Sequence, residues 1–185
     1  DNDDMVYKGA LSTTSYLIRM LNRGVSGLAR WEFHIYGQKW RNFGALTRLD
    51  PEYVFRPYGP VYYPHAITAR YVKPGWKVRQ LLMDTTTDDL YATVLTSAEG
   101  DITLMLLNDS NQPVSVELQL NIPVKTSVLH HLEVSGPVPE GIIRKTDMDL
   151  AKSEATVTLP PLSITTLTSL APGNLDLPEK LSLKR

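Results

Sequence analysis

Short apolar stretches separated by turn residues fill the second half of this 185-residue chain, and their spacing limits its fold more than any other feature. The clearest covers residues 114–121, where Val and Leu alternate with Ser, Glu, Gln and Asn. Such alternation is typical of a strand with one buried face. We expect strands over residues 78–83, 91–98, 102–107, 114–120, 127–134, 142–144, 155–159 and 163–170. Together they predict an antiparallel β-sandwich.

The two halves of the chain differ in composition. All three Trp, all three Phe and eight of the nine Tyr lie before residue 77, whereas Thr, Val, Leu and Ser dominate the second half. We place a boundary near Pro74-Gly75, a pair that stops a helix. This division predicts an N-terminal α/β unit over residues 1–76, a β-sandwich over 77–171 and a tail over 172–185 that wraps the surface or is mobile.

The first half is predicted to form a helix, a strand, a long loop and a second helix. Apolar residues at helical spacing predict the first helix over 10–22, ended by Gly24. An apolar run over 25–31 predicts a buried strand, and a second helix is expected over 61–72. Three prolines and a glycine argue against regular structure over 50–60. One strand with two helices cannot bury both faces of that strand alone.

Charge and composition exclude several classes of function. A net charge of −1 gives no reason to expect nucleic acid as a partner, and no apolar run approaches the length of a membrane helix. Without cysteine there is no disulfide framework, thiolate metal site or cysteine nucleophile. We find no phosphate loop, dinucleotide fingerprint or metal-ligand spacing among the four His, and we expect no cofactor.

The end of the predicted strand carries the strongest candidates for chemistry. Trp31 closes the apolar run and Glu32 follows it, at the position where parallel strands deliver side chains to a site. A carboxylate there would orient a substrate hydroxyl or transfer a proton, unless it pairs with Arg30 or Arg41. The flat Trp31 ring would stack on the C–H face of a sugar, or fill the core instead.

Three further candidates lie in the loop after this strand. Tyr36 and Trp40 have the same amphipathic rings as Trp31 and the same alternative role as core residues. His34 lies between them and Trp31, with plain surface exposure as its alternative. His130 and His131 are neighbours on a predicted strand, so they face opposite sides and cannot chelate one ion together.

The order of these elements resembles the last turn of a clan A glycoside hydrolase (β/α)8 barrel. The resemblance rests on Gly-Val-x-Gly-Leu-Ala-x-Trp at residues 24–31 and on Ala-Arg-Tyr-Val-Lys-Pro-Gly at 69–75. It implies that residues 10–22 are helix 7, 25–31 strand 8 and 61–72 helix 8. The second half resembles the β-sandwich that follows the barrel in several families, and families 39 and 30 are the most similar.

The resemblance implies a role in retaining glycoside hydrolysis, which uses two carboxylates. Trp31 matches the tryptophan that forms the floor of the sugar subsite in this clan. The catalytic carboxylates of the clan lie at the ends of strands 4 and 7, and this chain contains neither. Asp1, Asp3 and Asp4 would belong to the loop after strand 7.

We therefore expect a C-terminal fragment or subunit of a glycosidase that binds carbohydrate. Its partner would be the remainder of the barrel, with no nucleic acid and no membrane, and we expect a secreted or periplasmic location rather than a cytoplasmic one. The alternative is a non-catalytic carbohydrate-binding or structural β-sandwich module with a helical extension.

Overall fold

A computed structural model describes residues 2–27, 34–35, 46–48, 54–83, 88–121, 123–136, 141–149, 155–173, 175 and 181–182. Its elements, in chain order, are α1 (Asn2–Asn22), β1 (His34–Ile35), β2 (Leu46–Arg48), β3 (Val54–Pro57), α2 (Gly59–Ala69), β4 (Lys77–Arg79), β5 (Leu90–Thr96), β6 (Ile102–Asn108), β7 (Val114–Leu118), β8 (Val128–Ser135), β9 (Ile143–Arg144), β10 (Met148–Asp149), β11 (Ala155–Leu159), β12 (Ser163–Thr168) and β13 (Leu181–Ser182). The fold is a mixture of helices and mainly antiparallel sheet.

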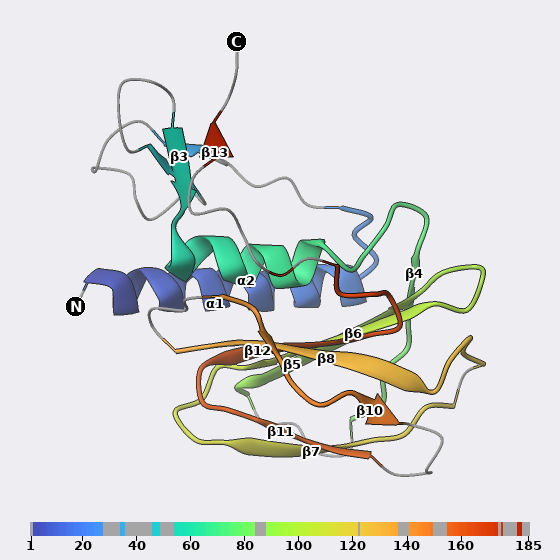
Figure 1. The fold of residues 1–185 in the computed structure, drawn as a ribbon. Helices are drawn as coiled ribbons and strands as arrows, with labels where there is room; N and C mark the ends of the chain where they lie inside the picture. The colour runs from blue at the N-terminus through green and yellow to red at the C-terminus, as the bar shows by residue number, and fades with distance from the viewer. Residues whose placement is uncertain are drawn as a thin grey trace.

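The main sheet has seven strands and lies between two layers (Figure 1). Its order is β10-β8-β12-β6-β5-β4, and β9 pairs with β8. Helices α1 and α2 cover one face, and the two-stranded sheet of β7 and β11 lies over the other. Every residue of β6 and β12 is buried, because both faces of these central strands are covered. Only alternate residues of β11 are buried, because that strand has one covered face.

Two hydrophobic clusters fill the spaces between the layers. The first joins the helices to the main sheet and includes Tyr7, Leu11 and Ile67 with Met105 and Leu132. The second lies between the two sheets and includes Val94, Leu104, Leu129, Val157 and Leu167. The helices of the N-terminal half therefore share a core with the strands of the C-terminal half.

Helix α1 confirms the predicted helix end and extends the predicted start. The amide of Val25 donates to the Met20 carbonyl at 3.1 Å and that of Gly24 to the Leu21 carbonyl at 3.0 Å. Gly24 has a φ of +89°, the left-handed conformation that closes a helix in this way. The helix begins at Asn2 rather than Ala10, since Val6 and Tyr7 already lie on its buried face.

Several local expectations were wrong. Residues 50–60 contain β3 and the start of α2, because Pro57 ends a strand and Pro60 lies in the first turn of a helix, where a missing amide is tolerated. Helix α2 ends at Ala69, three residues early. Strand β4 ends at Arg79, not at residue 83. Residues 25–27 form no strand, and the rest of the predicted strand, 28–31, lies outside the described residues.

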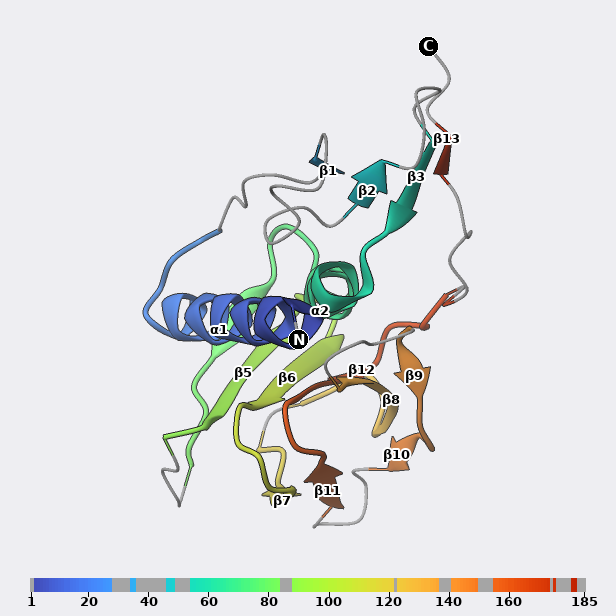
Figure 2. The same cartoon turned by 90° about the vertical axis from the view of Figure 1, so that its left-hand side faces the viewer.

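A third sheet, formed mainly by the N-terminal half, was not predicted. It has the order β1-β2-β3-β13, with β1 and β2 parallel and the other pairs antiparallel. Its strand β13 comes from the C-terminal tail, where Leu181 pairs with Phe55. Figure 2 shows this sheet on the side of the helices away from the main sheet.

Candidate functional site

The structure tests little of the predicted sugar site. Trp31, Glu32, Tyr36 and Trp40 lie outside the described residues. His34 begins β1, and its backbone is opposite Leu46 of β2. This strand lies on the helix side that faces away from the main sheet (Figure 2). The five site residues therefore stay a prediction.

The N-terminal acids take part in contacts within and between the helices. Asp3 accepts a hydrogen bond of 2.6 Å from the Tyr58 hydroxyl, which precedes α2. Asp4 pairs with Lys8 one turn later at 3.1 Å. Both acids lie in the first turn of α1, where the helix dipole favours negative charge. These contacts hold the start of α1 against the start of α2.

A polar cluster lies along β8 at one side of the main sheet. Glu133 is 3 % exposed and pairs with Lys145 at 3.3 Å, and the Ser135 hydroxyl also donates to it. In the same cluster, His130 and Arg144 both contact Asp147. The Nε2 atom of His131 is buried with no hydrogen-bond partner within the described part of the chain.

The charges around His131 act on its pKa in opposite directions. Burial lowers the pKa of His131 below its ordinary value, and Lys145 lowers it further. Glu133 and Asp147 act against this by raising it. The net shift is downward, which favours the neutral imidazole. Among the described residues no group of three His, Asp or Glu could hold a metal ion.

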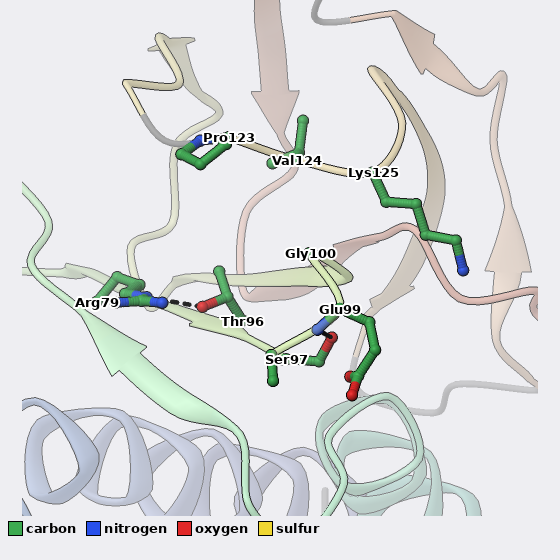
Figure 3. Close-up of a pocket in the computed structure, with 9 residues that line it drawn as sticks. Arg79, Thr96, Ser97, Glu99, Gly100, Pro123, Val124 and Lys125 are labelled. Carbon is green, nitrogen blue, oxygen red and sulfur yellow. Dashed lines mark hydrogen bonds between the residues drawn. The ribbon is translucent and has the colours of Figure 1, made fainter.

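A cleft opens at the rim of the main sheet, and we call it the rim cleft. It has a volume of about 540 Å³. Its lining comes from β4, the β5–β6 turn and the loop before β8 (Figure 3): Arg79, Thr96, Ser97, Ala98, Glu99, Gly100, Pro123, Val124 and Lys125. This volume lies in the range of small-molecule sites.

The sides of the rim cleft are held together by backbone contacts. The amide of Lys125 donates to the carbonyl of Gly100 at 2.9 Å, which fixes the loop to the turn. Gly100 has a φ of +87°, and an added Cβ would lie 3.2 Å from that Lys125 nitrogen. The Ser97 hydroxyl oxygen accepts the amides of Glu99 and Asp101, each at 3.1 Å. The turn is therefore rigid and requires glycine.

The rim cleft was not predicted from the sequence. Residues 99–101 only separated two predicted strands, and Arg79 had no predicted role. Arg79 meets Thr96 across β4 and β5, with its Nε donating to the Thr96 hydroxyl at 2.7 Å. That contact depends on the pairing of Val78 with Leu95. No local sequence pattern predicts this pairing. An arginine on a short edge strand was the only available signal.

Within the described ranges, neither helix is both long and apolar enough to cross a membrane. No protein-family model matches the sequence, and no curated protein matches it either. Solved structures of glycoside hydrolases do match the fold.

The catalytic domain of a glycoside hydrolase family 30 xylanase C from Talaromyces cellulolyticus aligns with a TM-score of 0.53 at 13 % identity, over 69 % of this chain and 27 % of that one. A family 30 endoxylanase from Clostridium papyrosolvens aligns with a TM-score of 0.49 at 18 % identity, and the alignment covers 60 % of this chain and 28 % of that one. A family 30 subfamily 8 xylanase from Clostridium acetobutylicum also aligns with a TM-score of 0.49, at 15 % identity, and the alignment covers 58 % of this chain and 27 % of that one.

At these identities the likeness is one of fold. The chain spans little more than a quarter of the length of these xylanases, between 27 % and 28 %. The alignment at 0.53 relates this arrangement of helices and antiparallel sheet to part of a glycoside hydrolase domain.

Proposed function

We propose that this chain is the C-terminal part of a retaining glycoside hydrolase. The observation that carries the proposal is the alignment of 69 % of the chain with 27 % of a xylanase catalytic domain at a TM-score of 0.53. In this proposal α1 and α2 are the last two helices of a (β/α)8 barrel, and the strands from β4 onward form the sandwich that braces it. The substrate would be a carbohydrate, and a xylan is the first to test.

The packing of the helices supports this arrangement. One face of α1 and α2 is occupied by the main sheet through the first hydrophobic cluster. Met5 and Tyr16 of α1 are nevertheless 62 % and 53 % exposed. Helices in a barrel pack on strands on one side, and exposed apolar groups mark surfaces that contact other elements. The remainder of the barrel would cover the exposed groups.

The proposed role of the site residues is to line a sugar pocket. Trp31 would be the floor beneath the sugar whose bond is cleaved, and Glu32, His34, Tyr36 and Trp40 would form one wall. An aromatic floor buries a large area and leaves few rotatable bonds to order. The two carboxylates, about 5 Å apart in a retaining enzyme, would come from the rest of the barrel.

The experiment uses the complete protein and follows xylan hydrolysis by proton NMR. We expect the first product to keep the anomeric configuration of the substrate. Trp31→Ala should lower kcat/KM by about tenfold to a hundredfold, since burying a large apolar side chain typically contributes about 1.5–3 kcal/mol. Trp31→Phe should restore part of the activity, because it keeps a flat apolar ring.

A thermal melt of each variant separates a binding role from a core role. If Trp31→Ala unfolds the protein, Trp31 belongs to the core and not to the pocket. Product of inverted configuration, or a complete protein that has no barrel and hydrolyses no glycan, would contradict the proposal itself.

A further inference from the structure

We propose that the rim cleft binds a carboxylate-bearing sugar, with Arg79 as the group that holds the carboxylate. The lining of the cleft comes from the main sheet and the loop before β8. Figure 2 shows the main sheet on the opposite side of the helices from β1. The choice of a sugar rests on the proposed function, whereas the choice of a carboxylate rests on the geometry of the cleft.

The guanidinium group of Arg79 is held in place and still has donors to give. Its Nε donates to the Thr96 hydroxyl at 2.7 Å, and Thr96 itself is only 5 % exposed. Arg79 is one of the residues that line the cleft, and within the described part of the chain no acceptor bonds its two Nη groups. A guanidinium fork with two parallel donors fits the two oxygens of a planar carboxylate.

The floor of the cleft adds a hydroxyl group. The Thr96 oxygen accepts from Arg79 Nε, so the hydrogen of that hydroxyl remains available for a bond to an acceptor. The Ser97 oxygen accepts the amides of Glu99 and Asp101 and holds the turn. A hydroxyl donor beside an arginine favours a ligand with negative charge and lone pairs.

The nearby carboxylates do not occupy Arg79. Asp101 is 3.7 Å from Lys125 and so pairs with the other cation of the cleft. Figure 3 shows the Glu99 side chain directed away from Arg79, on the opposite side of Gly100. The positive charge of Arg79 is thus available to an incoming anion.

The opposite wall is apolar and suits a sugar ring. Pro123 and Val124 face Thr96 and Gly100 across the opening (Figure 3). Compact apolar side chains can cover the C–H face of a pyranose while the hydroxyl groups of the sugar contact the polar floor. A volume of about 540 Å³ leaves room for one or two sugar units.

The experiment titrates the protein with D-galacturonate and records NMR shifts of the Arg79 Nε–H and of the Thr96, Ser97 and Gly100 amides. D-Galactose serves as the neutral analogue and inorganic phosphate as an anion without a sugar. For a ligand of this size in an open cleft we expect a dissociation constant on the order of 1 mM. Galactose should bind at least tenfold more weakly.

Arg79→Gln should weaken galacturonate binding at least tenfold, and Arg79→Lys should weaken it less, because lysine keeps the charge but loses the fork. Lys73→Gln removes an exposed cation outside the cleft and should leave binding unchanged. A thermal melt checks that each variant is folded. Equal binding of galactose, binding of phosphate alone, or galacturonate binding that survives Arg79→Gln would overturn the proposal.

This titration involves no turnover, so its result is independent of the hydrolysis assay. Failure to bind galacturonate would leave the proposed hydrolase role intact. An inactive complete protein would equally leave a measured carboxylate site in place, with only the preference for a sugar withdrawn.

Discussion

At the scale of single residues, Gly100 carries two constraints that can be separated. Its φ of +87° disfavours any side chain, and a Cβ would also approach the Lys125 backbone to 3.2 Å. Gly24 has nearly the same φ, +89°, with nothing within 4 Å of its Cβ. We expect Gly24→Ala to cost about 1–2 kcal/mol from the backbone conformation alone. Gly100→Ala should cost more, because the loop must also move.

Chemical denaturation of both variants measures this difference. The extra cost at Gly100 should appear as a lower denaturation midpoint than that of Gly24→Ala. Equal midpoints would show that the loop carrying Lys125 moves away without cost, and that the rim cleft is less rigid than its backbone contacts indicate.

We expect the protein to lose stability in mild acid because His131 is buried. Its folded pKa lies below the unfolded value near 6.5, mainly because of burial. A histidine with a lowered pKa binds its proton more readily in the unfolded state. The contribution of neutral His131 to the free energy of unfolding is therefore complete above pH 6.5. It falls as the pH drops from 6.5 toward the folded pKa.

NMR titration of the His131 imidazole should give a midpoint below 6.5. His131→Leu, which removes the titrating group, should lose less stability than the wild type between pH 7 and pH 5, where an unperturbed histidine titrates. If the two proteins lose stability in parallel over this range, other groups account for the acid sensitivity.

The contrast between Gly24 and Arg79 explains how much of the residue-level structure could be predicted. The amides of Gly24 and Val25 end α1 by bonding the carbonyls of Leu21 and Met20, so the signal lies within one short segment. Arg79 acquires its role from Thr96, 17 residues later, and from a loop beyond residue 120. Roles that arise from such distant pairing have no local signature.

At the scale of elements, α1 is attached to the main sheet near both ends. The Tyr7 hydroxyl donates to the Leu162 carbonyl at 2.8 Å, just before β12. At the other end, the Asn22 amide donates to the Ala92 carbonyl of β5 at 2.8 Å. Tyr7 is fully buried, so its hydroxyl cannot exchange this partner for water.

Tyr7→Phe should therefore lower the free energy of unfolding by about 1–2 kcal/mol, because the partly buried Leu162 carbonyl loses its hydrogen-bond donor. Tyr16→Phe is the matched control, since Tyr16 lies on the same helix and is 53 % exposed. Thermal melts of both variants measure the effect. A Tyr7→Phe protein as stable as the control would mean that the Leu162 carbonyl finds another donor.

The strands with strong alternation or long apolar runs were predicted within a few residues, and β11 was predicted with its observed bounds. Strands β10 and β13 were missed because two residues leave no periodicity to detect. Strand β3 was missed because proline generally interrupts regular structure, whereas Pro57 stands at the strand end, where it is tolerated. Short pairings are decided by the surrounding structure and not by their own sequence.

At the scale of the whole molecule, the two halves of the sequence meet in one core. The boundary near Pro74-Gly75 stays a prediction, but Tyr7 and Ile67 pack in the same cluster as Met105 and Leu132. Side chains of the sheet also bond the helical segment: Thr166 donates to the Ile67 carbonyl and Thr103 to the Tyr71 carbonyl. We infer that both helices and the main sheet unfold together.

Hydrogen exchange tests this coupling directly. We expect the most protected amides of α1 and β6 to exchange with the same free energy of opening, because separating the helices would expose the cluster that buries both. Leu11→Ala, at a fully buried position of α1, should lower both values equally, by about 2–5 kcal/mol. Ser12→Ala, at an exposed position on the same helix, should change neither by more than about 0.5 kcal/mol. If Leu11→Ala lowers protection in α1 alone, the helices form a separate unit, and the sheet would have to be stable with one face uncovered.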